Sequence, residues 1–279
     1  MKQILITGKN SYIARKTGQH LKNYDKEGIY YSITFISVRD SAWKSESFWK
    51  YDVIIHCAAI VHRKEKRSLC EEYRKINTQL TEEIAKKAKA EGVKQFIFLS
   101  TMNVYGMETG IITNQTLPFP KSLYGKSKLE AEKVLEDMRS EKFKVCILRP
   151  PMVYGKGCRG NYRRLSEFVN IMPVFPDVDN KRSMIYIENL CHCIKQVIEE
   201  ERDGTLLLQN ECYVSTSEMV ALIAKQHNHT IWISRKFNFI LFLMPRHLRD
   251  KIFGEMIYQD GERISLISFE ESIERAERR

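Results

Sequence analysis

The chain has 279 residues, enough for one large domain or two modest ones, and its 43% hydrophobic and 29% charged residues are typical of a soluble globular protein. The formal net charge of +10 is not concentrated in any basic block of five or more residues, which argues against a nucleic-acid-binding arm. Seven scattered cysteines without CxxC spacing argue against a disulfide framework and favour a reducing compartment.

The first half of the chain alternates short apolar runs with helix-like segments. Strands are predicted over residues 2–8, 30–38, 51–59, 93–100 and 143–150, where β-branched and aromatic residues gather. Helices are predicted over 11–24, 71–92 and 122–142, with Gly92 as a C-terminal stop and Ser122 as an N-cap. Because the strands are nearly continuously apolar and alternate with helices, the pattern predicts an α/β fold with a Rossmann-type, doubly wound parallel sheet.

After Pro150 the pattern loosens into loops containing glycine and proline, with helices predicted near 187–200 and 215–228. We expect residues 1–152 to form a dinucleotide-binding domain and 153–279 a smaller, closely docked substrate-binding region. The CHC triplet at 191–193 would point its side chains in different directions on a helix, so no metal site is expected. The chain begins in a strand, with no room for a signal peptide, and its longest late apolar run (237–244) is too short for a membrane span. We therefore expect a cytoplasmic protein.

The stretch TGKNSYIA (7–14) follows the first strand, where a dinucleotide-binding loop would lie. Such loops use three glycines for the tight turn, the approach to the pyrophosphate and close helix packing. Gly8 keeps the first, while Ser11 and Ala14 occupy the other two positions, and Ser11 requires a negative φ or mild strain. The helix N-terminus behind the loop still offers N–H groups to an anion. Taken alone, the loop is a weak match to the dinucleotide-binding motif, because it keeps one of the three glycines.

Hydroxyl and amine side chains follow later in the pattern. Tyr124 and Lys128 are four residues apart on a predicted helix, so they lie on one face, and an ammonium beside a phenol stabilises the phenolate. The stretch FLSTMNVYG (98–106) places Ser100 and Thr101 at the carboxyl end of a strand, where ligands bind in open α/β sheets. Together these residues predict a site for proton transfer next to a nucleotide.

At this point the chain resembles the extended short-chain dehydrogenase/reductase family, the NAD-dependent epimerase/dehydratase group acting on nucleotide sugars, and in particular its UDP-glucose 4-epimerase-like branch. The resemblance is carried by ILITGKNSYIA, DVIIHCAAIVH, INTQLTEEIAKKAKAEGVKQFIFLSTMNVYG, PFPKSLYGKSKLEAEKVL, LRPPMVYGKG and KRSMIYIENL, in the family's order over roughly residues 3–190. The region after about 205 matches only loosely.

The resemblance implies roles for individual residues. Tyr124 would be the catalytic acid/base, Lys128 the partner that lowers its pKa and binds the nicotinamide ribose, and Thr101 a hydrogen-bonding partner of the reacting sugar oxygen. The cofactor would be held by Gly8, Asn10, Ser11, Tyr12, Ile13, Arg39, Asp40, Ala58, Ala59, Asn77, Ser100, Tyr124, Lys128 and Pro150, and the substrate by Thr101, Met102, Asn103, Asn161 and Arg182. Arg182 would bind the sugar nucleotide's diphosphate. His56 and His62 are expected to be structural.

The resemblance implies one of several reactions. A 4-epimerase oxidises the sugar C4 hydroxyl reversibly, whereas a 4-keto-sugar reductase consumes NADPH for the return step alone. A 4,6-dehydratase carries an Asp–Glu pair after the catalytic threonine, and Met102 and Asn103 stand there instead, so this reaction is disfavoured. We expect an NAD(P)-dependent nucleotide-sugar 4-epimerase, in bacterial surface polysaccharide synthesis. The alternatives are the reductase and a catalytically inactive dinucleotide-binding sensor or scaffold.

The sequence leaves the choice between NAD and NADP undecided, and it identifies the substrate and the protein partner only by class. The second strand ends before Arg39 and Asp40; an acidic residue there would hold the ribose hydroxyls of NAD, and an arginine would meet the 2′-phosphate of NADP. NAD is slightly favoured. The resemblance implies a substrate with a nucleotide diphosphate, UDP-linked by expectation, and a homodimer formed through helices around 71–92 and 122–142.

The segment 235–254 places an apolar run among Arg235, Lys236, Arg246, Arg249 and Lys251. We expect it to pack on the core as a subdomain helix. The alternative is peripheral docking on an anionic bilayer, without a transmembrane segment, which would suit an enzyme of lipid-linked sugar diphosphates.

Overall fold

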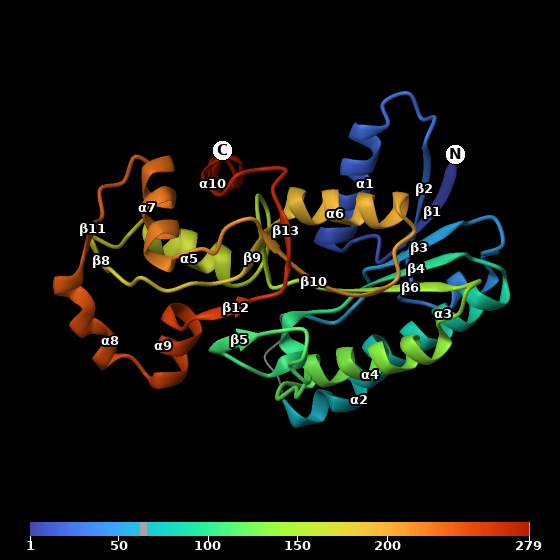
Figure 1. Cartoon of the computed structure of the whole chain (residues 1–279), viewed down its shortest axis with the longest axis horizontal. Coiled ribbons are helices and arrows are strands. Elements are labelled where there is room, and N and C mark those ends of the chain that lie inside the picture. The colour runs from blue at the N-terminus through green and yellow to red at the C-terminus, as the bar shows by residue number, and fades with distance from the viewer. Residues whose placement is uncertain (62–65, 279) are drawn as a thin grey trace. The chain divides into compact units, whose positions relative to one another are not determined.

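The computed structural model describes residues 1–61 and 66–278, which form two compact units (Figure 1). The first comprises 1–106, 117–150 and 190–207, and the second 107–116, 151–189 and 208–279. The chain passes through the second unit at 107–116 and again from 151, and it returns to the first unit for 190–207, which supplies most of a further helix and part of a further strand of the parallel sheet. Within the described ranges, no helix has the length and apolar content needed to cross a bilayer.

A parallel sheet organises the first unit. Its strands are β1 (Lys2–Thr7), β2 (Tyr31–Ile36), β3 (Val53–His56), β4 (Gln95–Leu99), β6 (Lys144–Arg149) and β10 (Gly204–Asn210). The order β13-β10-β6-β4-β3-β1-β2 includes β13 (Glu262–Ile264), which pairs with residues 208–210 of β10 inside the second unit. All these pairs are parallel, which confirms the predicted doubly wound fold.

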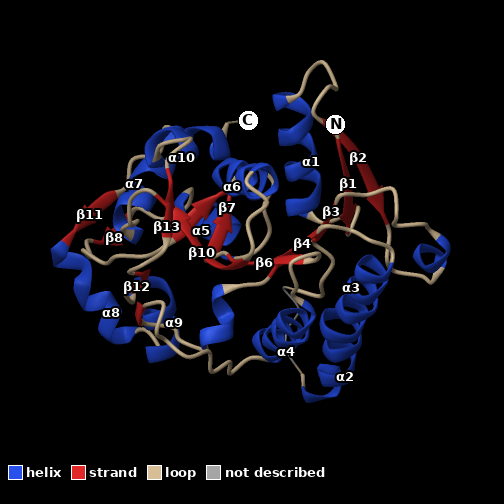
Figure 2. Ribbon diagram, turned by 45° about the vertical axis from the view of Figure 1, so that its right-hand side comes forward, coloured by secondary structure: helices blue, strands red, loops and turns tan. Residues whose placement is uncertain are grey.

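Helices cover both faces of this sheet (Figures 1 and 2). On one face lie α1 (Tyr12–Tyr24) and α6 (Ile187–Glu199), and on the other α2 (Cys70–Tyr73), α3 (Leu80–Ala90) and α4 (Leu123–Met138). The helix predicted over 71–92 is α2, a π-helical stretch Arg74–Gln79 and α3 in succession, and it stops before Gly92, which has a φ of +82°. Buried side chains such as Ile54, Phe96 and Leu135 form the core on the α3 and α4 side.

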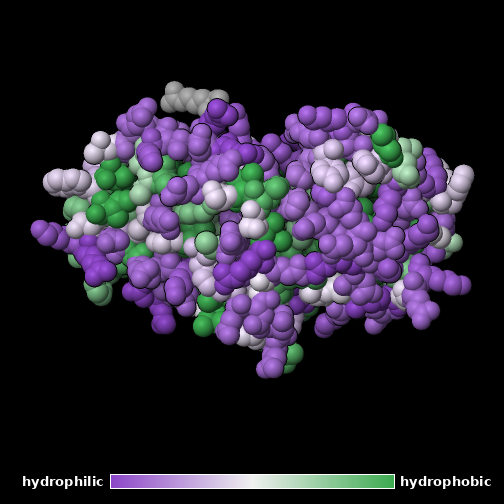
Figure 3. Space-filling view, turned by 45° about the horizontal axis from the view of Figure 1, so that its top comes forward, coloured by the Kyte–Doolittle hydropathy of each residue, from purple (hydrophilic) through white to green (hydrophobic). Residues whose placement is uncertain are grey.

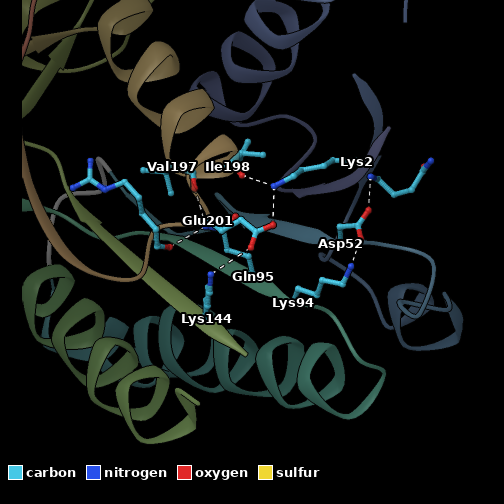
Figure 4. Close-up of polar contacts among 10 residues, drawn as sticks. Lys2, Asp52, Lys94, Gln95, Lys144, Val197, Ile198 and Glu201 are labelled. Carbon is cyan, nitrogen blue, oxygen red and sulfur yellow. Dashed lines mark hydrogen bonds and ion pairs between the residues drawn. The ribbon is translucent and has the colours of Figure 1, made fainter. Parts of the chain in front are cut away.

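Polar contacts fasten α6 to the amino-terminal ends of the strands (Figure 4). The Lys2 Nζ donates to the Ile198 carbonyl at 2.7 Å and pairs with Glu201 at 3.1 Å, and Lys144 reaches the same carboxylate at 3.3 Å. The buried Gln95 amide donates to the carbonyls of Val197 and Arg202, both at 2.9 Å. These bonds satisfy carbonyls at the C-terminus of α6, where cations are favoured. The contacts lie at the amino-terminal ends of the strands, so the carboxyl ends remain for ligands.

The second unit is built from short elements. Its strand pairs are β5 (Gly110–Ile112) with β12 (Met256–Tyr258), β7 (Met152–Tyr154) with β9 (Met184–Tyr186), and β8 (Val174–Pro176) with β11 (Trp232–Ser234). Its further helices are α5 (Asn161–Val169), α7 (Thr216–Gln226), α8 (Ile240–Leu243), α9 (Arg246–Phe253) and α10 (Phe269–Glu277). The buried Tyr154 hydroxyl bonds to Ser272 at 2.6 Å and accepts from Asn210 at 2.9 Å, so this phenol is hydrogen-bonded inside the unit.

Candidate active site

The predicted site residues of the first unit follow the carboxyl ends of neighbouring strands. Gly8 follows β1, Ala58 follows β3 by two residues, Ser100 and Thr101 follow β4, and Pro150 follows β6. The strand order reverses between β1 and β3, and in open α/β sheets ligands bind at the carboxyl edge beside such a reversal. The sheet therefore brings together segments that are far apart in sequence.

The loop between β1 and α1 has the conformation that a dinucleotide-binding turn requires. Gly8 has a φ of +78°, and a Cβ there would lie 2.9 Å from the Ala58 backbone nitrogen, so only glycine fits. Ser11 is the N-cap of α1 with a φ of −67°, so its side chain causes no strain, and its hydroxyl does not cap the helix. The first turn of α1 carries no acidic residue. Asn10 is exposed, while Tyr12 and Ile13 are half-buried.

Arg39 and Asp40 lie exposed after β2, on the other side of the same loop. The Asp40 carboxylate accepts a hydrogen bond from the Ala42 backbone at 3.0 Å, and the Arg39 backbone nitrogen lies 3.5 Å from the Ser37 hydroxyl. Ala58 is buried and Ala59 half-buried, so both stay close to the sheet. The structure thus leaves both candidate ribose-binding side chains at the surface.

Thr101 and Tyr124 form a hydrogen-bonded pair. Thr101 is the buried N-cap of a short 3-10 helix, Met102–Tyr105, and its hydroxyl also accepts from the Asn103 backbone at 3.2 Å. Burial raises the pKa of the Tyr124 phenol above its ordinary value, and the side-chain hydrogen bond with Thr101 acts in the opposite direction. The two hydroxyls predicted to meet one sugar oxygen are therefore adjacent.

The start of α4 explains how Tyr124 reaches this position. Ser122 caps the helix by accepting from the Gly125 backbone at 2.9 Å, as predicted. A Cβ on Gly125 would lie 2.6 Å from the Asn103 carbonyl oxygen, so glycine lets the helix approach the Thr101 turn. The Met102 backbone donates to the Pro150 carbonyl at 2.9 Å, which ties this turn to the end of β6. Tyr124, the predicted acid/base, is thus followed directly by the glycine whose close contact positions it.

Lys128 lies one turn further along α4 and is only 1% exposed. Its Nζ donates to the Leu99 carbonyl at 2.6 Å and lies 4.2 Å from the centre of the Phe98 ring. Burial lowers its pKa to about 8, against the opposing influence of Cys57 and Glu132. At neutral pH the Lys128 side chain therefore remains a cation at the carboxyl end of β4. It holds its proton less tightly than an exposed lysine does.

A buried ionic network begins at Glu132, one helical turn after Lys128 on α4. It was not predicted from the sequence. The Glu132 carboxylate accepts from Ser100 and pairs with the Arg149 guanidinium, whose Nη2 lies 2.6 Å from Oε2 and whose Nε contacts both oxygens. Arg149 also donates to the Tyr105 hydroxyl at 2.8 Å. The available signal was spacing: Glu132 is four residues after Lys128 and eight after Tyr124, and therefore lies on the same helix face.

Asn77 joins three segments of the first unit and is fully buried. Its side-chain oxygen accepts from the Ile60 backbone nitrogen at 2.8 Å, and its amide donates to the Ile60 carbonyl at 3.2 Å and to Ser127 at 3.0 Å. Ser127 in turn donates to the Tyr124 carbonyl at 2.9 Å. The Asn77 amide thus bonds to the segment after β3 and to α4.

Two predicted substrate-binding residues belong to the second unit. Arg182 is half-buried, donates from Nη1 to the Gly254 carbonyl, and has a pKa lowered by burial. Its backbone also bonds to Val214 in both directions, at 3.0 and 2.9 Å. Asn161 is exposed at the start of α5. Arg182 is therefore held by its own unit, with a guanidinium that has further donors to offer.

His56 is a fully buried residue of β3, between hydroxyls and rings. Its Nδ1 lies 2.8 Å from the Thr7 hydroxyl and its Nε2 3.0 Å from the Thr81 hydroxyl, and its ring stacks on Phe96 and Phe98. Burial and the charge of Lys128 lower its pKa to about 3. This residue is a neutral structural link between β1 and α3. His62 lies outside the described residues.

We expect His56 to make the protein sensitive to mild acid. Below the unfolded pKa of about 6.5, the unfolded chain takes up a proton that the folded chain refuses until about pH 3, so stability falls with pH in this window. Between pH 7 and 5 this one residue should cost about 2 kcal/mol of unfolding free energy. Urea unfolding at both pH values checks this, since His56→Gln should lose that much less than the parent chain. An imidazole NMR signal of His56 that titrates near pH 6.5 would contradict it.

Comparison with known proteins places this geometry in context. Residues 4–207 match the model of the NAD dependent epimerase/dehydratase family. A UDP-glucose 4-epimerase from Vibrio cholerae is 32% identical over 239 residues, an alignment that covers 81% of this chain and 72% of that protein. An N-acetyl-alpha-D-glucosaminyl-diphospho-ditrans,octacis-undecaprenol 4-epimerase from Escherichia coli O157:H7 is 27% identical over 216 residues, covering 72% of this chain and 64% of the relative.

Solved structures share the fold at lower identity. A UDP-glucuronic acid 4-epimerase from Bacillus cereus in complex with NAD has a TM-score of 0.73 and 18% identity, covering 99% of this chain and 97% of the other. A dTDP-4-dehydrorhamnose reductase from Bacillus anthracis in complex with NADP has a TM-score of 0.71 and 19% identity, covering 99% and 98%. Epimerases and reductases thus share this architecture.

Proposed function

Since the chain belongs to the NAD-dependent epimerase/dehydratase family, we propose that it is a nucleotide-sugar 4-epimerase that oxidises and re-reduces the sugar at C4. The predicted family, the doubly wound fold and an enzyme that uses NAD or NADP are confirmed by the family match. One observation carries the proposal of mechanism. The hydrogen-bonded Thr101–Tyr124 pair and the buried Lys128 lie together at the carboxyl edge of a parallel sheet, where a ligand binds.

The residues of the first unit fit a dinucleotide. The turn at Gly8 has no room for a side chain, and α1 begins with neither an acidic residue nor a hydroxyl cap, so its N-terminus suits a pyrophosphate. We assign Gly8, Ser11 and the first turn of α1 to the diphosphate, and Arg39 and Asp40 to the adenosine ribose. Lys128 would hold the nicotinamide ribose. The bound nicotinamide supplies hydride acceptance from C4 and hydride return.

Tyr124 is proposed to take the proton of the C4 hydroxyl during oxidation and to return it during reduction. Thr101 would donate a hydrogen bond to the same sugar oxygen and keep it beside the phenol. Burial alone holds the phenol protonated, so a positive charge must lower its pKa for it to act as a base near neutrality. Lys128, a cation one helical turn away, is the described group that could supply this charge.

Epimerase chemistry is preferred over the alternatives for two reasons. The Vibrio cholerae protein that is 32% identical to this chain is a UDP-glucose 4-epimerase. Met102 and Asn103, at the position of the dehydratase Asp–Glu pair, provide no acid or base for eliminating water. A 4-keto-sugar reductase is the second candidate, because reductases share the fold. An inactive dinucleotide-binding scaffold is the third, and the intact Thr101–Tyr124–Lys128 set speaks against it.

The substrate is proposed to be UDP-linked. The named activity of the Escherichia coli relative also makes a sugar linked through diphosphate to a polyprenol a candidate, since both kinds of substrate present a diphosphate beside the sugar. We further propose a cytoplasmic homodimer acting in bacterial surface polysaccharide synthesis, with Arg182 and Asn161 in the second unit as substrate-binding residues.

Incubating the purified protein with UDP-glucose or UDP-N-acetylglucosamine and NAD should produce the C4 epimer, which chromatography of the nucleotide sugars detects. Net oxidation of cofactor is not expected, because each hydride is returned. If no epimer forms but NADPH is consumed with a 4-keto sugar nucleotide, the reductase assignment replaces this one. Native mass spectrometry of the purified protein identifies any copurified NAD or NADP.

A further inference from the structure

The segment after β11 packs only in part on its own unit: Phe237, Ile240 and Leu241 are half-buried, and the 3-10 turn contacts β8. None of its residues from Arg235 to Leu243, a 3-10 turn followed by α8, is buried. Phe242 and Leu243 are 83% and 78% exposed, and Phe239 and Trp232 are exposed as well. Only further on, in α9, does Phe253 become buried. One side of the apolar run therefore lies at the surface, and several large apolar side chains exposed close together are typical of an interaction site.

The exposed side chains share one face. Phe239, Phe242 and Leu243 have the spacing i, i+3 and i+4 on consecutive helical turns, which places them side by side. Trp232 belongs to β11, which contacts the same 3-10 turn. We call these four residues the apolar patch. Figure 3 shows hydrophobic side chains emerging among hydrophilic ones at its left, the side on which Figure 1 draws β11 and α8.

Basic residues lie before and after Phe239, Phe242 and Leu243 in sequence. Residues 231–254 contain five basic side chains and one acidic one, a net charge of +4: Arg235, Lys236, Arg246, Arg249 and Lys251 against Asp250. The ion pairs from Arg235 to Asp177 and from Arg246 to Asp250 are long, 3.8 and 3.6 Å, with both arginines highly exposed. Such pairs bind weakly, so the guanidinium groups remain available to an external anion.

We propose that the apolar patch and its flanking basic residues dock the second unit on an anionic membrane surface. Apolar side chains on one helical face enter the boundary between headgroups and acyl chains, and the arginines and lysines around them meet anionic headgroups. The excess of five basic residues over one acidic residue in this segment is complementary to a negatively charged membrane surface. Where the proposed function holds, docking would place the enzyme beside membrane-held sugar diphosphates.

Co-sedimentation with lipid vesicles tests the docking. The whole protein is mixed with vesicles of equal parts phosphatidylcholine and phosphatidylglycerol, and with vesicles of phosphatidylcholine alone, at low and high salt. We expect sedimentation with the anionic vesicles at low salt and its loss at high salt, because the charge contribution is screened. Equal sedimentation with both kinds of vesicle, or none with either, would overturn the proposal.

Substitutions separate the apolar contribution to vesicle binding from the electrostatic contribution. Phe242→Ser with Leu243→Ser should weaken binding on the order of tenfold or more, since two apolar side chains no longer leave water. Lys236→Gln and Arg246→Gln should weaken it roughly fivefold each. The control is Trp49→Ser, which removes an equally exposed aromatic residue of the first unit and should change nothing. Vesicle binding by the serine double variant at the parent level would refute the assignment.

Two further readouts keep the outcomes distinct. If the double serine variant converts a dimeric parent into monomers in vesicle-free buffer, as measured by analytical ultracentrifugation, a second copy of the chain covers the patch and the docking proposal fails. Epimerisation of a UDP-sugar in vesicle-free buffer should be unchanged in this variant. Absence of that turnover in the parent chain would contradict the proposed function while leaving the vesicle result intact.

Discussion

Replacing Tyr124 with phenylalanine is expected to reduce turnover by about 10²–10⁴-fold while leaving dinucleotide binding within a few fold of the parent chain. The substitution removes the hydroxyl that bonds to Thr101 and that would exchange a proton with the sugar, but it keeps the ring that the start of α4 positions. Turnover is measured by chromatography of sugar nucleotides, and binding by calorimetry with NAD and with NADP.

Tyr51→Phe is the matched control for this substitution. Tyr51 is buried and donates its hydroxyl to Glu46 at 3.3 Å, but it lies outside the candidate site. It should retain parental turnover. A Tyr124→Phe enzyme with parental turnover would exclude this phenol as the acid/base, and loss of both turnover and nucleotide binding would indicate a structural effect instead.

Replacing Glu132 with glutamine is expected to lower the free energy of unfolding by about 3–5 kcal/mol. The neutral amide leaves the Arg149 guanidinium without its bidentate partner, and both side chains are almost wholly shielded from water. Breaking a buried ion pair from one side is costly because the remaining charge cannot return to solvent. Urea unfolding at neutral pH measures the change.

Glu167→Gln is the control on the same kind of substitution. Its pair with Arg163 at 2.8 Å is exposed, so its loss should cost no more than about 1 kcal/mol. Should Glu132→Gln fail to fold, the double variant with Arg149→Met removes both charges and is expected to recover most of the stability. Equal effects of Glu132→Gln and Glu167→Gln would show that the buried network contributes little.

Much of the first unit could be predicted from the sequence because its signals are local. The five predicted strands and three predicted helices of the first 150 residues are all present, since continuous apolar runs, Ser122 as a cap and Gly92 as a stop each act within a few residues. Gly8 at positive φ and Ser11 at negative φ were likewise predictable, because the conformational requirement belongs to each residue alone.

Features that depend on distant partners could not be predicted in this way. The three-residue strands of the second unit are too short for a periodic pattern. The ion pair between Glu132 and Arg149 joins a helix to the next strand, and the local sequence around either residue does not indicate which residue it pairs with. The turn at Phe239–Leu243 has the composition of a core, and only the fold determines that Phe239, Phe242 and Leu243 are exposed while Ile240 and Leu241 are half-buried.

The side chain of Asn77 has a consequence for how this sequence can change over time. It imitates a peptide group, offering one acceptor and two donors to the Ile60 backbone and to Ser127. Aspartate has the shape but not the donors, leucine has the volume but neither, and glutamine is one carbon too long. A change at this position should therefore be costly, because the Asn77 amide links the segment after β3 to the helix of Tyr124.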